Sequence, residues 1–448
     1  MNTLQKSRVN SKEFTTSNQT RRKFADYTSW IVIFLLAAIL QGLFYTKILA
    51  MVASRNLPIF RLTSYYLLPT DLFFVPLAIF VSMFALMDSK WQKTHTNRGV
   101  YLIVWFFICS LGIIVGIYYH NTDLFGDIRE YLLRSILVWA FYFIGIRSNV
   151  SIALDRVINL SVVIASVLIF NNLLFLAGIE LSFATIIDVR HIHIWAEYAL
   201  LFPYSLILSH VLMRPAKPWV RIQLTILALG TFSNLWKPNV AAFLICTMLA
   251  IVISRTRKGI YDGVANYRGQ IIMTIIVSIL LLAGFIMVSG SDNYVSNLIL
   301  KTYLKQGFAI QDITGGRSSL ARIAINGWLT HPILGNGFGA RLAGDVLNSG
   351  LGKYVYMSAV DPHNLALQLL FHTGIVGVVV VLAIIIGWLQ RVLKADQQDN
   401  SSYRIGLIVF ILTVLITSLY GQMLQSEVAG YLFWASVGLE AAMAASTL

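Results

Sequence analysis

The chain is organised around two stretches, GGRSSLARIAINGWLTHPILGNGFGA (Gly315–Ala340) and DPHNLALQLLFHTGIVG (Asp361–Gly377). They belong to a polar, glycine-rich segment of roughly 75 residues, which is far longer than an ordinary connection between helices. The segment ends at His363-Asn364, where a long apolar run begins. A loop of this length and composition is typical of a functional segment, because a simple link between two helices does not need it.

The rest of the chain is too apolar for a water-soluble protein. Of its 448 residues, 57% are hydrophobic and 12% are charged, whereas soluble domains carry about 25% charged residues. Apolar runs of about 20 residues recur along the whole length, which predicts an all-α polytopic membrane protein. The net charge of +14 does not indicate nucleic-acid binding, because the basic residues are spread over short connections between these runs.

Apolar length places about twelve membrane spans. They are Trp30–Tyr45, Asp71–Met87, Val100–Tyr119, Leu132–Ile146, Ala153–Ala177, Ile194–Met213, Trp219–Phe232, Val240–Ser254, Ile271–Val288, Asn364–Gln390, Ile405–Leu419 and Glu427–Ala445. The predicted domains are a cytoplasmic polar tail (1–28) without a cleavable signal peptide, spans one to nine (29–288), a large external loop with short helices (289–363), and spans ten to twelve (364–448).

Basic residues predict the orientation, because they gather in every second connection. Two such sets are Arg214, Lys217 and Arg221, and Arg391, Lys394 and Arg404. These connections and both termini are expected in the cytoplasm, and the large loop is expected outside. A transporter or flippase is the rival class. It predicts matched halves with interrupted helices and charges inside the membrane, whereas Glu440 is the one acidic residue well inside a predicted span.

Ser318 to Thr330 shows the spacing of an amphipathic helix, which Pro332 ends. Its apolar face comprises Leu320, Ile323, Ala324, Gly327 and Trp328. Arg317 projects from the edge of that face, and Arg322 lies on the opposite face. Both arginines could simply anchor the helix at the membrane surface. The functional interpretation is that Arg317 grips an anion there, because a guanidinium matches phosphate oxygens and keeps its charge.

Two motifs after this helix, a glycine-rich turn and a histidine, are candidate parts of a functional site. Gly335 and Gly337 open GNGFG, which predicts a sharp turn beside a ligand or another helix. His363, before Asn364 and after Asp361, is either a solvated residue at the membrane boundary or a titratable group of the site.

Further cations are expected at external helix ends, where they either anchor the interface or contact an anionic ligand: Lys237, Arg190, Arg129 and Arg134. No set of residues has metal-ligand spacing.

These motifs together resemble the O-antigen ligase and surface-polysaccharide polymerase family. The resemblance rests on Gly-Arg, then Trp-Leu-xx-His-Pro-Ile-Leu-Gly-Asn-Gly, then His-Asn and a span with Gly-Ile-Val-Gly. It implies a GT-C-like membrane glycosyltransferase of the bacterial inner membrane, with its active site facing the periplasm. By position, Arg317 matches the family's loop arginine and His363 its loop histidine. Lys237 stands where the family commonly has Ser-Arg, and Arg190 matches another basic position less closely.

The function that the resemblance implies is transfer of glycans from an undecaprenyl-diphosphate carrier, without a metal or cofactor. We expect a polymerase that joins lipid-linked repeat units with inversion at the anomeric carbon, and a ligase that uses a lipid A core acceptor is the alternative. His363 and Arg317 are the expected catalytic residues. Arg317, Arg322, Lys237 and Arg190 are expected to bind the diphosphate, and Asn364, Asp361, Gly335 and Gly337 to support the site. Expected partners are the glycan donor and acceptor, the bilayer, a chain-length regulator and a flippase, but no nucleic acid.

Overall fold

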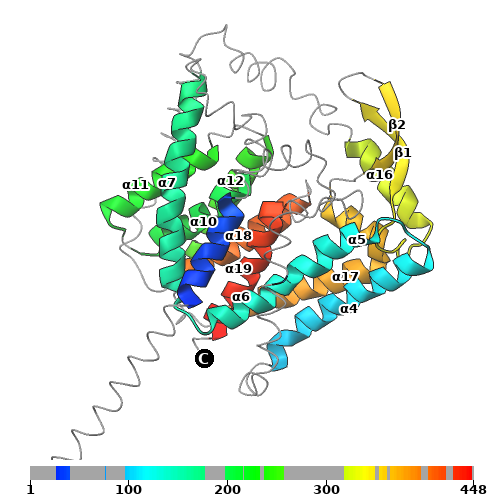
Figure 1. Cartoon of the computed structure of the whole chain (residues 1–448), viewed down its shortest axis with the longest axis horizontal. Coiled ribbons are helices and arrows are strands. Elements are labelled where there is room, and N and C mark those ends of the chain that lie inside the picture. Colours follow the sequence, from blue (N-terminus) through cyan, green and yellow to red (C-terminus); the bar gives the residue numbers. More distant parts are fainter. Residues whose placement is uncertain are drawn as a thin grey trace, which may run out of the picture.

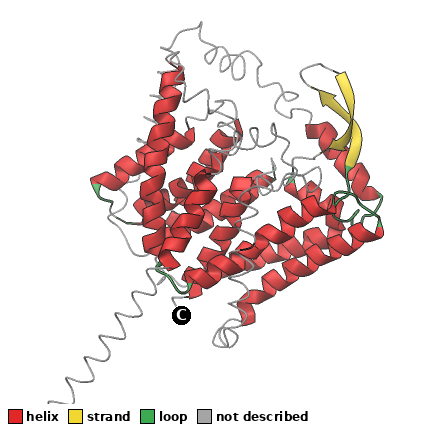
Figure 2. Ribbon diagram, in the orientation of Figure 1, coloured by secondary structure: helices red, strands yellow, loops and turns green. Residues whose placement is uncertain are grey.

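A computed structural model describes residues 27–40, 76, 96–176, 197–214, 216–232, 237–256, 317–348, 353–360, 364–394, 402–419 and 427–445. The described part is mainly helical (Figures 1 and 2). After a first helix, Tyr27–Leu40, the elements are α4 (Thr96–Tyr118), α5 (Leu124–Asp127), a π-helix η2 (Ile128–Leu133), a 3₁₀ turn η3 (Arg134–Ile136), α6 (Leu137–Gly145), α7 (Val150–Leu176), α10 (Glu197–Met213), α11 (Pro218–Phe232), α12 (Lys237–Thr256), α16 (Arg317–Leu329), β1 (Leu342–Asn348), β2 (Lys353–Val360), α17 (Leu365–Lys394), α18 (Ser402–Ser418) and α19 (Glu427–Ala445).

Helices α10 and α18 form the centre of the bundle. Residues of α10 are buried almost without exception, so this helix has no polar face and lies inside the protein. It packs against α7, α11, α12, α18 and α19. Gly406 of α18 lets the two central backbones approach closely, since a Cβ atom there would lie 2.6 Å from the Leu206 Cα. Small residues at such crossings are typical of helix packing in membranes, where burial from water contributes little between helices.

The outer faces of the bundle are apolar, which confirms that this is an integral membrane protein. Large exposed side chains follow one face of α4, of α7 and of α17: Ile103, Phe107, Ile114 and Ile117; Leu160, Val163, Val167 and Phe170; Ile375, Val379, Leu382 and Ile386. In water such stripes would promote aggregation, whereas lipid tails solvate them. Three described helices are long and apolar enough to cross a membrane, over Val150–Phe170, Leu365–Val392 and Val428–Ala445, and five shorter apolar helices accompany them.

The count of twelve spans stays a prediction. Two expected spans, Asp71–Met87 and Ile271–Val288, lie outside the described residues apart from residue 76. Helices cover the positions expected for the other spans, with the first described only as far as Leu40. The span predicted at Leu132–Ile146 corresponds to a helical segment that begins earlier, at Leu124. This segment comprises α5, the π-helix, the 3₁₀ turn and α6.

Three charged residues are buried, which the charge pattern alone does not predict. Arg404, assigned to a cytoplasmic connection, is buried in α18, where its Nε donates to Glu440 Oε1 of α19 at 2.9 Å. Arg129 and Arg134, expected at an external helix end, are also buried, and the guanidinium of Arg134 lies 5.3 Å from the centre of the Tyr431 ring. A count of charges along the chain cannot distinguish a solvated arginine from one enclosed by neighbouring helices.

The large loop contains the short helix α16 and, in addition, two strands that the sequence analysis did not predict. Strands β1 and β2 form an antiparallel hairpin that pairs Leu342 with Val360 and Asn348 with Lys353. The second strand, KYVYMSAV, is rich in β-branched and aromatic residues, which favour extended structure. The hairpin stands beside α16 at one end of the bundle (Figure 1). We call this end, where α17 begins, the loop end.

Candidate functional site

Helix α16 packs along the start of α17 at the loop end. It spans Arg317–Leu329, close to the predicted Ser318–Thr330. The predicted apolar face meets its neighbours, because Leu320 and Ala324 are buried together with Leu342 and Phe371. Arg322 is exposed, as expected for the opposite face. Arg317 is the first residue of the helix, and its backbone alone is described.

Helix α17 is broken at Gly374, within the predicted apolar run. Gly374 has φ 65° and ψ −166°, far from helical values, and this left-handed φ favours glycine. In an unbroken helix the carbonyls of Phe371 and His372 would accept from the amides of Ile375 and Val376. The break separates these four backbone groups. Each needs a new partner, because an unpaired backbone group inside a protein or a bilayer is costly.

The turn that follows α16 supplies all four partners. The bonds are Asn336 N to Phe371 O (2.8 Å), Gly337 N to His372 O (3.0 Å), Ile375 N to Pro332 O (3.0 Å) and Val376 N to Ile333 O (3.3 Å). Two bonds of a continuous helix are thus replaced by four bonds to the turn. We call residues 330–341 the glycine turn. It is attached to a membrane-spanning helix through the backbone.

The other side of the glycine turn meets the end of α4 and the start of α5. A Cβ atom at Gly337 would lie 2.2 Å from the Gly116 nitrogen, so no larger residue fits there. Phe338 N donates to Gly112 O at 2.8 Å. The same constraint applies at Gly335, where a Cβ atom would lie 2.5 Å from the carbonyl carbon of His372. Both predicted glycines therefore turn the chain against helices.

Two aspartates after α4 hold the glycine turn by charge-assisted bonds. Asp127 Oδ2 accepts from Gly339 N at 2.5 Å, and this carboxylate is buried. Asp123 Oδ2 accepts from Arg341 Nε at 2.6 Å near the surface. His372 lies behind them, buried, with Nδ1 2.9 Å from Gly337 O and 3.6 Å from Asp127 Oδ2. These contacts fix the position of the turn on both neighbouring helices.

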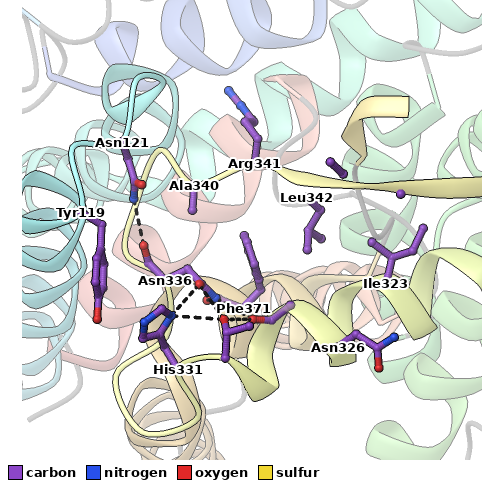
Figure 3. A pocket seen from close by; sticks show the side chains of 14 residues that line it. Tyr119, Asn121, Ile323, Asn326, His331, Asn336, Ala340, Arg341, Leu342 and Phe371 are labelled. Atoms are coloured by element: carbon purple, nitrogen blue, oxygen red, sulfur yellow. Dashed lines mark hydrogen bonds between the residues drawn. The ribbon is translucent and has the colours of Figure 1, made fainter. Parts of the chain in front are cut away.

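A cavity of about 580 Å³ opens between the glycine turn, α16 and the hairpin. Figure 3 shows its lining, which mixes polar side chains with a few apolar ones. The lining residues are Tyr119, Asn121, Ile323, Asn326, Gly327, Thr330, His331, Asn336, Ala340, Arg341, Leu342, Ala343, Gly344 and Phe371. The volume is in the range of small-molecule sites. Because Asn326 lies four residues after Arg322, the predicted arginine shares its side of α16 with the cavity.

His331 and Asn336 form an ordered polar pair in this cavity. Asn336 Nδ2 donates to the carbonyls of Gly327 (3.0 Å) and Phe371 (3.3 Å), so its Oδ1 faces His331. That oxygen lies 2.9 Å from His331 Nδ1, and an amide oxygen can only accept. Nδ1 of His331 therefore carries the proton, and in the neutral ring Nε2 has a free lone pair. The Tyr119 ring supports the imidazole, with ring centroids 4.6 Å apart (Figure 3).

The described residues include only part of the predicted site. Asn364 precedes α17, where its Oδ1 accepts from Leu367 N (3.1 Å) and its Nδ2 donates to Leu419 O (2.5 Å). Lys237 begins α12, but its side chain is not described. His363, Asp361 and Arg190 lie outside the described residues. Their roles, like those of Arg317 and Arg322, stay predictions.

The sequence interpretation missed several groups that build the site. Asp123 and Asp127 lie more than 200 residues before the turn that they hold, and no local pattern connects them. His331 was part of the recognised motif without receiving a role. A glycine inside an apolar run was the available signal for the break at Gly374.

Within the described ranges, no three His, Cys, Asp or Glu residues gather as metal ligands, and the metal-free reaction stays a prediction.

Residues 222–382 match a family model described as O-antigen ligase. The matched stretch begins in α11 and ends in α17, so it includes α16, the glycine turn and the hairpin. A search of curated proteins finds no match. The family match supports the resemblance that the loop motifs indicated: residues 222–382 of this membrane protein are similar to the O-antigen ligase family.

The packing of the glycine turn predicts that Gly337→Ala destabilises the loop end. The substitution adds strain at φ 75° and a clash with the Gly116 backbone, which together should cost more than about 2 kcal/mol. Thermal unfolding of the purified protein in detergent measures the effect. Gly344→Ala is the control, because its Cβ atom would meet only the flexible Ile323 side chain at 3.0 Å. Equal unfolding midpoints for the two variants would contradict this account.

Proposed function

We propose that the protein is a glycan polymerase of the bacterial inner membrane, which joins undecaprenyl-diphosphate-linked repeat units into a surface polysaccharide at the periplasmic face. The observation that carries the proposal is the polar cavity at the loop end. It lies where lipid-facing helices end, largely within the stretch that matches the O-antigen ligase family. A lipid-linked sugar needs this combination, because its polyprenyl tail must stay in the bilayer while its sugars are held in a polar site.

The proposed reaction needs no energy source beyond the donor. The acceptor hydroxyl oxygen attacks the anomeric carbon of the donor sugar, and the bond from that carbon to the diphosphate oxygen breaks. Undecaprenyl diphosphate leaves, and His363 takes the proton from the hydroxyl. A single displacement inverts the anomeric configuration. External cations stabilise the negative charge on the leaving group, as fixed donors do in other transfer reactions.

In this proposal Arg317 contacts the donor diphosphate at the start of α16. Arg322, Lys237 and Arg190 are proposed as further cations around it. The connectivity of the helices supports a place for Lys237 at the loop end. Helix α11 begins at the opposite end, beside the start of α18, and a four-residue connection then leads from its end to Lys237.

His331 and Asn326 are proposed to hold the sugars in the cavity. The free Nε2 of His331 can accept a hydrogen bond from a sugar hydroxyl, and the Asn326 amide can both donate and accept. His331 is half-buried and already oriented by Asn336. It is therefore suited to orient a substrate, whereas His363, directly before Asn364, is proposed as the base.

The alternative, a ligase with a lipid A core acceptor, differs in its product. Deletion of the gene should leave single repeat units on the lipid carrier, because the protein that joins them is missing. The lipid-linked glycans are extracted and sized by electrophoresis or mass spectrometry. Long glycans that remain on the carrier would identify the ligase. Normal polysaccharide on the cell surface would contradict both functions.

The role of His363 predicts a large loss of turnover in His363→Ala. A lost general base lowers the rate by about 10²–10⁴-fold, while donor binding should change little, because the diphosphate contacts lie elsewhere. Single-turnover transfer and donor binding are measured separately with purified protein. His331→Ala is the comparison, and it should mainly weaken acceptor use. Near wild-type turnover in His363→Ala, or a loss confined to donor binding, would show that His363 is not the base.

The role of Arg317 predicts a defect in donor use. Loss of a charge-assisted bond to a partly desolvated phosphate should weaken donor binding by about tenfold or more in Arg317→Ala. Arg317→Lys should recover only part of this, since lysine keeps the charge without the planar fork. Arg322→Ala, on the exposed side of the same helix, is the matched control and should have a smaller effect. Equal defects in the two alanine variants would contradict the assignment.

A further inference from the structure

A second polar cavity, of about 430 Å³, lies between α7, α10, α11 and α18. It opens at the end of the bundle opposite the candidate active site. Helix α17 begins at the loop end, and the part after its break, Ile375–Lys394, spans about 30 Å. A short connection then leads to Ser402, which lines the second cavity. The proposed glycan transfer uses none of these lining residues.

Hydrogen bonds between helices fix the walls of this cavity. His210 Nδ1 of α10 lies 2.9 Å from Ser402 Oγ of α18, and the His210 ring stacks on the Tyr403 ring. The Tyr403 hydroxyl donates to Asp155 of α7. Together these contacts connect three helices around one space. The cavity is therefore preformed by contacts within the described part of the chain.

The floor is a side-chain pair between α7 and α11. Gln223 Nε2 donates to Asn159 Oδ1 at 2.6 Å. Gln223 Oε1, the second Gln223 amide proton and the Asn159 amide protons keep capacity for a ligand. A polar floor of this kind suits a hydrophilic group better than an acyl chain.

The electrostatic character of the cavity favours an anion. Arg214 and Lys217 line it from the connection between α10 and α11, and Asp155 is the one acidic residue in its lining. Asp155 already accepts from Tyr403, which stabilises its charge. The lining thus contains two cationic side chains and one carboxylate.

Three helix N-termini add to this positive potential. Helices α7, α11 and α18 begin at Val150, Pro218 and Ser402, and each has a lining residue in its first turn or directly before it. Helices of 15 or more residues carry partial positive charge at their N-termini. The helix ends act here on a cavity that already contains two cationic side chains.

Exposed apolar side chains neighbour the lining residues at the starts of α7 and α11, and we call them the rim. Ile152 at the start of α7, and Trp219 and Ile222 at the start of α11, are exposed. Tryptophan is enriched at the boundary between headgroups and acyl chains. A cationic cavity with an apolar rim matches an amphiphile, with its phosphate inside the cavity and its acyl chains along the rim.

We propose that the cavity lined by Arg214, Lys217 and the Asn159–Gln223 pair binds a phosphate group, that of an anionic lipid headgroup. The shared chemistry is a phosphate ester, and a soluble phosphate ester is the other possible source. Binding here ties α7, α10, α11 and α18 together at the end of the bundle remote from glycan transfer. The proposal is independent of the proposed polymerase function.

The test measures lipid binding to the purified full-length protein by native mass spectrometry. The probes are dioleoyl phosphatidylglycerol, dioleoylglycerol as a phosphate-free control, and glycerol 3-phosphate as a soluble competitor. Arg214→Gln with Lys217→Gln should weaken phosphatidylglycerol binding by about tenfold or more, since each basic residue beside an anionic lipid contributes a factor of about five. Both side chains are exposed, so the variant is expected to fold.

Two further variants make the test specific. Arg391→Gln, which removes an exposed cation outside the cavity lining, should leave binding nearly unchanged. Asp155→Asn, which removes the one acidic charge and keeps an acceptor for Tyr403, should strengthen binding by about threefold. Displacement by glycerol 3-phosphate would support a soluble phosphate ester as the ligand, and no displacement would support the headgroup. Equal binding of dioleoylglycerol, or equal losses in the Arg391 and Arg214/Lys217 variants, would overturn the proposal.

Discussion

The break of α17 at Gly374 is the constraint on which the loop end depends. Backbone groups that a helix leaves unpaired inside a membrane protein must find partners within the protein. Here the partners come from the glycine turn, so the broken helix and the loop are stable only together. The same four bonds that satisfy α17 also set the position of α16, which directly precedes the turn. Any substrate held by α16 is therefore held relative to a membrane-spanning helix.

The aspartates after α4 complete this arrangement from the other side. The glycine turn lies between α17 and the α4–α5 junction, with Asp127 buried beneath Gly339 and Asp123 paired to Arg341 at the rim. The chain thus has a rigid platform where a loop of this length would otherwise have many conformations. Preorganised polar groups lose little entropy when a substrate binds. The His331–Asn336 pair is one result, because its orientation follows from carbonyls of α16 and α17.

Inside the bundle, a buried ion pair joins three helices. The pair of Arg404 and Glu440, with Trp388 Nε1 3.3 Å from the second carboxylate oxygen, joins α17, α18 and α19. Buried ion pairs contribute little net stability, but removal of one partner is costly. This pair therefore selects one mutual arrangement of three helices. The two cavities lie at opposite ends of the bundle: α17 contributes Phe371 to the first, and α18 contributes Ser402 and Tyr403 to the second.

The sequence by itself determined the features that depend on local composition and period. Apolar length identified membrane helices, and helical spacing identified α16 and its buried face. The glycines and the His-Pro motif identified the turn and the similarity to the O-antigen ligase family. The tertiary structure alone decided which polar groups meet. Asp127 and Gly339 are 212 residues apart, and Asp123 and Arg341 are 218 apart. Burial of Arg134, the hairpin pairing and the cavity beside Arg214 likewise depend on neighbours from distant parts of the chain. The physical reason is that the spacing of apolar residues depends on a single helix and can be read along the chain. The hydrogen-bond partner of a polar group depends on how separate helices pack against one another.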